Sequence, residues 1–493
     1  MSDTASEPTG PARTSSFPFR TELVLLALIG LVFALICVFL VARGAPLGHD
    51  EAVYALKART LAQGTSSAYF WNDYRAPGLP IVLALIGRVV SSDASMRLGV
   101  VLFGGLAVLL TWLIGRTLFD QRVGLIAASG MAFSPVVVAS ASAVWPDLPG
   151  TAVGLAALAV LIFSSRGERV RWWVLWAAPL SVAATLVRFG APIPIGIGAL
   201  AIVAWRWDAV RRSIPQVLAL GFLTAIPVGA ILGTSQVLGL SMSPLDAIAT
   251  LNERNALPFY RGLVDYAKLG DFLLLNPAGV ALATGLAVGV VVAIRQGRNR
   301  GAFGLSAGIA AVTVLVLVFT LHGEYRYLTP AYPWLWMTAA YGLNEISLSM
   351  RKEYAVSIAG ILLGLALLSG IADGGLEVTH NKERFPDIRA AARLIDSVTA
   401  DGECGVVTGY VPQVSWYSHC VTANYSLGGV RITSASFPVD PTLYVFVVQN
   451  GKRQPAKSVL DDYLDQTSGE CIVVGEPTSG PFRYVRACPV SDT

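Results

Sequence analysis

Long apolar runs interrupt this sequence at intervals, and they constrain its fold more than any other feature. The first run covers 23–42, which is about the 20 residues that a helix needs to cross the hydrocarbon core of a bilayer. Of the 493 residues, 54% are hydrophobic and 14% are charged. A soluble protein carries about 25% charged residues. The sequence therefore predicts a polytopic α-helical membrane protein.

Lysine and arginine residues collect in every second loop between the apolar runs. Because basic loops stay on the cytoplasmic side, this alternation predicts about eleven spans, a cytoplasmic N-terminus and an extracytoplasmic C-terminus in the plasma membrane. The run at 81–90 is too short to cross, and we expect a re-entrant or interfacial helix there. The basic clusters are Arg116 with Arg122, Arg166 with Arg169 and Arg171, Arg206 with Arg211 and Arg212, Arg295 with Arg298 and Arg300, and Arg351 with Lys352.

Composition divides the chain into three parts. The beginning is rich in serine, threonine and proline, so 1–22 is expected to form a disordered cytoplasmic tail. The apolar runs make 23–373 the transmembrane module. Beyond it the apolar runs become short and turn residues frequent, which predicts an extracytoplasmic α/β domain over 374–493. The net charge of +4 is small and indicates no nucleic-acid partner.

The last part alternates predicted strands and helices. Short apolar runs at 404–407, 443–448 and 471–474 predict buried strands. Helical spacing of apolar residues at 388–400 and 455–463 predicts two helices. This alternation favours a small α/β fold.

Four of the five cysteines, Cys404, Cys420, Cys471 and Cys488, lie in this last part. An even number in an exported domain predicts two disulfides. The similar segments GECGVVTG and GECIVVGE are each followed by a cysteine at a similar distance. This favours the pairs Cys404–Cys420 and Cys471–Cys488 among the three pairings that are possible.

Charged and aromatic residues gather in the loops that are predicted to face outward, at 49–80, 140–149, 235–271 and 322–329. Arginine donates paired hydrogen bonds to phosphate oxygens, and a carboxylate can take a proton from a hydroxyl. Together they indicate chemistry on a phosphate. The first loop supplies Asp50, Glu51, Tyr54, Lys57 and Arg75, the second supplies Asp147, and the fourth supplies His322, Glu324, Arg326 and Tyr327.

Each of these loops also has a structural interpretation. A charge cluster after a span is typical of a solvated loop. Asp147 could be a helix N-cap beside an interfacial Trp145. Arg326 could form a structural ion pair with Glu324, and Arg188, at the end shared by two apolar runs, could simply extend to the membrane surface.

Four stretches carry a resemblance to a known family. They are the acidic pair Asp50-Glu51 after the first span, the run DEAxYALxARxLxxG that it begins, the segment RAPGLP and the loop GEYRYLTPAYP. In these stretches the chain resembles the GT-C membrane glycosyltransferases. It is most similar to the family 39 group of protein O-mannosyltransferases and lipid A aminoarabinose transferases. The resemblance covers roughly the first 350 residues of the chain.

The resemblance implies a transferase that uses a polyprenyl-phosphate sugar at the outer membrane face, with a glycan, lipid or protein as acceptor. It implies that Asp50 or Glu51 acts as base or orients the acceptor, and it favours Asp50, the first acid of the pair and the one nearer the end of the span. It also implies that Asp147 is the acidic residue of the second loop. Arg75 and Arg326 would contact the donor phosphate, with Arg188 as a further candidate. A single displacement would invert the anomeric centre. It implies no certain cofactor, although a divalent metal could be held by Asp50, Asp147 and His322.

Two other classes of protein are alternatives to this interpretation. A transporter or lipid-linked sugar flippase would place charges in the middle of its spans and break its helices. Here the spans are mostly free of charge and the charged residues cluster in outward loops. A non-enzymatic scaffold would depend on the C-terminal domain and tolerate loss of the loop carboxylates.

Overall fold

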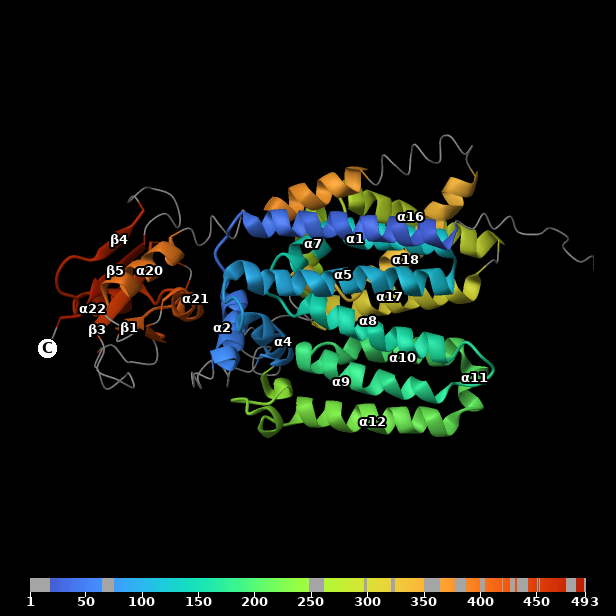
Figure 1. Ribbon diagram of the computed structural model, residues 1–493, viewed down its shortest axis with the longest axis horizontal. Coiled ribbons are helices and arrows are strands. Elements are labelled where there is room, and N and C mark those ends of the chain that lie inside the picture. The colour runs from blue at the N-terminus through green and yellow to red at the C-terminus, as the bar shows by residue number, and fades with distance from the viewer. Residues whose placement is uncertain are drawn as a thin grey trace, which may run out of the picture.

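The computed structural model shows a bundle of helices with a small sheet domain at one end (Figure 1). The apolar helices make this a membrane protein. The residues that the structure describes are 18–63, 75–247, 261–296, 299–320, 324–349, 364–376, 387–399, 404–418, 420–425, 431, 442–449, 451, 453–475 and 485–491.

The first half of the membrane module forms from the predicted apolar runs and the loops between them. The predicted helix at 81–90 appears as α4, which remains too short to cross a bilayer. The elements are α1 (Phe19–Ala42), α2 (His49–Gln63), α4 (Gly78–Gly87), α5 (Asp93–Leu118), α6 (Gln121–Phe133), α7 (Pro135–Ala141), α8 (Asp147–Ser164), η1 (Trp172–Trp176), α9 (Ala177–Val187), α10 (Pro192–Trp205), α11 (Trp207–Arg211) and α12 (Ile214–Gly233).

The second half continues with short loop helices and three long ones. They are η2 (Gln236–Leu238), α14 (Arg261–Lys268), α15 (Gly270–Leu273), α16 (Pro277–Gln296), α17 (Arg300–Thr320), η3 (Tyr325–Leu328) and α18 (Tyr332–Ser349). A further apolar helix covers Gly364–Leu376.

Within the described residues, 6 helices are long and apolar enough to cross a membrane, or up to 7 if a bent pair is one span. The bent pair is α6 and α7, which meet at 60° where the sequence predicts one continuous run. Pro135 begins α7, and proline has no N–H with which to continue the preceding helix. Shorter apolar helices also occur in the bundle, so the count of about eleven spans and their orientation stay predictions.

Small residues allow two helices of the module, α16 and α18, to cross closely. A Cβ atom added to Gly342 in α18 would lie 2.0 Å from the carbonyl oxygen of Gly285 in α16. Glycine at such positions lets two helix backbones approach and pack tightly within a membrane. The crossing joins α18 to α16 and thereby supports the loop that precedes α18.

The C-terminal part forms a five-stranded mixed sheet in the order β2-β1-β3-β5-β4. Strand β1 pairs in parallel with β2 and β3, whereas β5 pairs antiparallel with β3 and β4. The predicted strands and helices are all present, but β2, β5 and α21 were not expected. The elements are α20 (Ile388–Val398), β1 (Cys404–Val407), α21 (Val411–Tyr417), β2 (Val421–Ala423), β3 (Thr442–Val448), α22 (Lys457–Leu464), β4 (Ile472–Val474) and β5 (Val485–Pro489).

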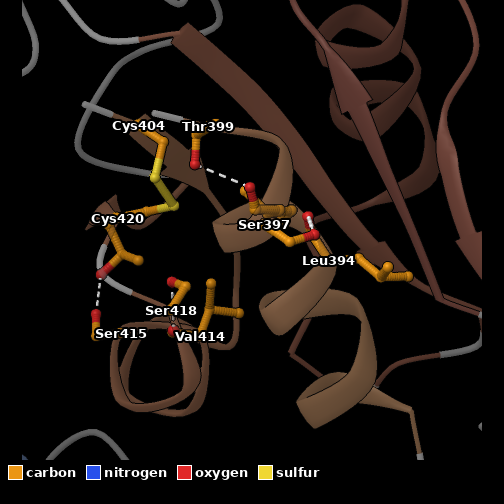
Figure 2. The surroundings of a disulfide bond; sticks show 10 residues. Leu394, Ser397, Thr399, Cys404, Val414, Ser415, Ser418 and Cys420 are labelled. Carbon is orange, nitrogen blue, oxygen red and sulfur yellow. Dashed lines mark hydrogen bonds between the residues drawn. A yellow bond between two sulfur atoms is a disulfide. The ribbon is translucent and has the colours of Figure 1, made fainter. Parts of the chain in front are cut away.

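Both predicted disulfides are present. Cys404 bonds Cys420, and Cys471 bonds Cys488. The first bond joins the start of β1 to the residue that precedes β2, so it encloses α21, as Figure 2 shows. The fifth cysteine, Cys37, is free and buried in α1.

Candidate active site

Asp50 lies between two arginines that come from other loops. It stands in the first turn of α2, and its Oδ1 accepts a hydrogen bond of 2.9 Å from Nη2 of Arg75. Its Oδ2 accepts another of 2.9 Å from Nη2 of Arg326. Burial raises the pKa of the Asp50 carboxyl, but the two guanidiniums outweigh burial and hold this pKa well below its usual range. Asp50 is therefore a carboxylate at neutral pH.

Arg326 is held from several sides. Its Nε donates to Glu324, and its guanidinium carbon lies 4.8 Å from the ring centre of Trp145 and 5.2 Å from that of Tyr327. Stacking on aromatic faces suits the flat, weakly hydrated guanidinium. The short helix η3 thus presents Arg326 to Asp50 in one orientation.

Asp147 forms a second ion pair nearby. It is the first residue of α8 and not its N-cap, which is Pro146. Its side chain is buried, and Oδ1 lies 2.9 Å from Nη2 of Arg188 at the end of α9. The Arg188 guanidinium also lies over the Tyr327 ring, 5.5 Å from its centre. The ring of Tyr327 therefore lies under the guanidiniums of both ion pairs.

Glu51 has a different environment from its neighbour. It is 1% exposed, and Oε1 accepts from Nε of Arg97 and from the Val144 N–H, each at 2.9 Å. Its Oε2 accepts from Nη2 of Arg97 at 3.0 Å and from the Gly48 N–H at 2.8 Å. A carboxylate that holds this many donors in the interior acts as a structural anchor. Sequence reasoning missed Arg97, whose only signal is one charge at the start of an apolar run.

Tyr54 and Lys57, which the sequence places after the acidic pair, are both buried on α2. Nζ of Lys57 donates a 2.8 Å hydrogen bond to the carbonyl of Arg75 and so helps to fix the segment that carries this arginine. Burial raises the pKa of Tyr54, so its hydroxyl stays protonated.

Tyr266 is a site residue that sequence reasoning missed. It comes from α14 in the loop 235–271, which the sequence predicts to face outward. Its side chain is 7% exposed, and within the described part of the chain its hydroxyl has no hydrogen-bond partner. Burial raises the pKa of this hydroxyl. Of the nearby charges, Glu324 and Asp147 also raise the pKa, whereas Arg188 lowers it. The hydroxyl is thus a donor within the electrostatic reach of the Asp147–Arg188 pair and of Glu324.

A groove begins beside these ion pairs. It is a small groove, partly open to the surroundings, and Arg188 is the charged residue of its wall. The other walls come from α8, from α10 and from the start of α18. The lining residues are Gly150, Thr151, Gly154, Leu155, Leu158, Ala191, Pro194, Ile195, Pro330 and Trp334.

The described residues do not form a metal centre. No three His, Cys, Asp or Glu side chains gather closely enough in the described ranges to hold an ion. Asp50 and Asp147 are each paired with arginine, a donor set that suits anions better than a divalent cation. His322, the third predicted ligand, lies outside the described residues. Metal binding at this site therefore stays a prediction.

The structure joins a helical membrane module to a small α/β domain, and carboxylates and arginines gather at the end where the two meet. This is the GT-C-like architecture that the sequence predicts. The comparisons with known proteins agree with this class. Residues 74–231 match the family model of dolichyl-phosphate-mannose-protein mannosyltransferases. No curated protein sequence matches the chain significantly.

Among solved structures, the chain is similar to ArnT from Cupriavidus metallidurans in the apo state, with a TM-score of 0.63, 14% identity, and 95% of this chain and 98% of that chain covered. ArnT bound to undecaprenyl phosphate matches with a TM-score of 0.63, 15% identity and the same coverage. The oligosaccharyltransferase AglB from Archaeoglobus fulgidus, in complex with an inhibitory peptide and a dolichol-phosphate, matches with a TM-score of 0.58, 14% identity, and 95% and 74% of the two chains. The predicted resemblance to the GT-C membrane glycosyltransferases is confirmed at the level of the fold.

Proposed function

We propose that this protein is a membrane glycosyltransferase that moves a sugar from a polyprenyl-phosphate donor to an acceptor hydroxyl at the outer membrane face. The observation that carries this proposal is the position of Asp50 between Arg75 and Arg326. The ring of Tyr327 joins Arg326 to Arg188, which lines an apolar groove. One solved ArnT structure is bound to undecaprenyl phosphate and one solved AglB structure is in complex with a dolichol-phosphate. Both are of the lipid-phosphate class that would carry the sugar in the proposed donor.

The arginines suit a phosphate that becomes a leaving group. When the sugar–oxygen bond breaks, its electron pair stays on the polyprenyl phosphate, whose new negative charge needs donors that are already in place. Arg75 and Arg326 are held by Asp50 before the donor binds, so their charges are oriented in advance. The apolar groove would take the first part of the polyprenyl chain.

Donor binding would also change Asp50. While two guanidiniums hold its pKa low, this carboxylate is a weak base. A donor phosphate that takes over hydrogen bonds from the arginines would raise this pKa and release a carboxylate oxygen. Asp50 could then accept the proton of the acceptor hydroxyl while the hydroxyl oxygen attacks the anomeric carbon. A single displacement of this kind inverts the configuration at the anomeric carbon.

The test is sugar transfer by purified protein from radiolabelled polyprenyl-phosphate sugars. Asp50→Asn keeps the size of the side chain but cannot accept the proton, so transfer should fall by about 10²–10⁴-fold. Asp120→Asn is the matched control, because Asp120 accepts from the Val123 N–H at the start of α6, away from this site. Full activity of Asp50→Asn would remove the proposed base, and a parent protein that translocates lipid-linked sugar without transferring it would favour the flippase.

A further inference from the structure

The segment that leads into α2 has its backbone held by side chains. Nη1 of Arg97 donates to the Ala45 carbonyl at 2.7 Å, and Nη2 donates to the Pro46 carbonyl at 3.1 Å. The Gly48 N–H donates to Glu51 at 2.8 Å. Backbone groups of a buried loop need such partners, because an unpaired one costs free energy. Asp50 follows this segment directly.

The C-terminal domain supplies further partners of the same segment. The Leu47 N–H donates to the hydroxyl of Tyr417 at 2.6 Å. Nη2 of Arg389 donates to the Ala45 carbonyl at 3.1 Å, beside the bond from Arg97. Residues from α20 and α21 therefore fix the backbone immediately before α2, across more than 300 residues of sequence.

Asp93 joins these residues to the membrane module. This first residue of α5 accepts hydrogen bonds from Nε1 of Trp416 at 2.6 Å, from the hydroxyl of Tyr417 at 2.7 Å and from Arg389. We call Asp93, Arg389, Trp416 and Tyr417 the Asp93 cluster. Arg97, which anchors Glu51, stands one turn further along α5. The beginning of α5 therefore contacts both α2, through Arg97, and the C-terminal domain, through Asp93.

Helix α21 packs directly against α2, as Figure 1 shows. All its side chains are buried, and Nη1 of Arg59 in α2 donates to the Trp416 carbonyl at 3.0 Å. The disulfide between Cys404 and Cys420 ties the end of α21 to the sheet, as Figure 2 shows. The helix is therefore held both by α2 and by the sheet.

We propose that the C-terminal domain is a positioning part of the active site. Tyr417 and Arg389 hold the segment 45–48 and so set the direction in which α2 presents Asp50 to Arg75 and Arg326. Neither residue touches the reacting atoms, and both act through the backbone. This inference rests on the proposed function for its kinetic consequence, but the contact itself can be tested without activity.

The test compares two tyrosine variants in the full-length protein. Tyr417→Phe keeps the ring but removes the hydrogen bonds to Leu47 and Asp93. Tyr425→Phe is the matched control, because its buried hydroxyl donates to the Phe446 carbonyl at 2.7 Å within the C-terminal domain. Arg389→Met is a second positioning variant, which keeps the aliphatic stem without the donor.

Hydrogen exchange of peptides covering 45–50 should be faster in Tyr417→Phe and Arg389→Met than in the parent, and unchanged in Tyr425→Phe. The kcat of sugar transfer should fall by about tenfold to a hundredfold with little change in the KM for donor, since a misplacement of about 1 Å can cost that much. Thermal unfolding should remain cooperative in all three variants.

Unchanged exchange at 45–50 would overturn the proposal, and so would faster exchange with a parental kcat. If the parent transfers no polyprenyl-phosphate sugar, the proposed function fails. In that case, faster exchange in both positioning variants would still show that Tyr417 and Arg389 stabilise the backbone of 45–48.

Discussion

The carboxylate of Asp50 and the guanidinium of Arg326 lie 2.9 Å apart, although 276 residues separate them in the sequence. The pair joins the first turn of α2 to the short helix before α18. Two arginines meet at this carboxylate, and their positive charges would repel each other without it. Asp50 therefore offsets part of their charge in advance, and an anionic donor could take over its contacts to the arginines.

Removal of either arginine should weaken use of the donor. Arg75→Ala and Arg326→Ala should each raise the KM for a polyprenyl-phosphate sugar, because the loss of one charge-assisted hydrogen bond costs about 1.5–3 kcal/mol. Steady-state kinetics over a range of donor concentrations measure this change. Arg88→Ala, an exposed arginine at the end of α4, is the control. Parental KM values in both variants would place the phosphate elsewhere, with Arg188 as the next candidate.

Glu51 should be needed for stability more than for chemistry. Glu51→Gln leaves Arg97 charged and buried without its anionic partner, which typically costs about 3–5 kcal/mol. Thermal unfolding in detergent should show a clearly lower Tm than for Asp50→Asn. If Glu51→Gln unfolds like the parent but transfers no sugar, Glu51 would instead be the base.

Tyr266→Phe should weaken donor binding without lowering stability. Within the described residues the hydroxyl has no partner to lose, so the Tm should stay equal or rise slightly. The charges of Arg188, Asp147 and Glu324 act on this hydroxyl, and we expect it to form a hydrogen bond with the bound donor, so its loss should raise the donor KM. Isothermal titration with the donor and thermal unfolding measure the two effects. Unchanged affinity would make Tyr266 a simple part of the core.

His49 should contribute to the acid sensitivity of the protein. Burial, and then the charges of Arg453 and Arg75, lower the pKa of His49 from its usual value of 6.5 to about 4. Between these values the unfolded chain binds a proton that the folded protein does not, so stability falls as the pH falls from about 6.5 to 4. His49→Gln cannot take up this proton. Its Tm should therefore decline less than that of the parent over this range, and an identical decline would contradict the assignment.

Some features could be predicted because they depend on nearby residues alone. Helices α1, α5 and α17 follow their apolar runs, since the transfer of a run into lipid depends on its own side chains. The disulfide pairing also followed from a repeated local pattern. By contrast, β2 and β5 are short and owe their pairing to neighbouring strands, which no local pattern records.

The sequence by itself also identified Asp50, Glu51, Arg75 and Arg326 as charged residues of two separate loops. It favoured Asp50 over Glu51 as the base, but it held no distance to show which of the two adjacent carboxylates meets the arginines. On a helix their side chains diverge by about 100°, so each enters a different environment. Asp50 points to Arg75 and Arg326, whereas Glu51 turns into the core toward Arg97. Only the tertiary structure separates these two carboxylates, because the pairing of buried charges depends on distances between segments that are remote in the chain.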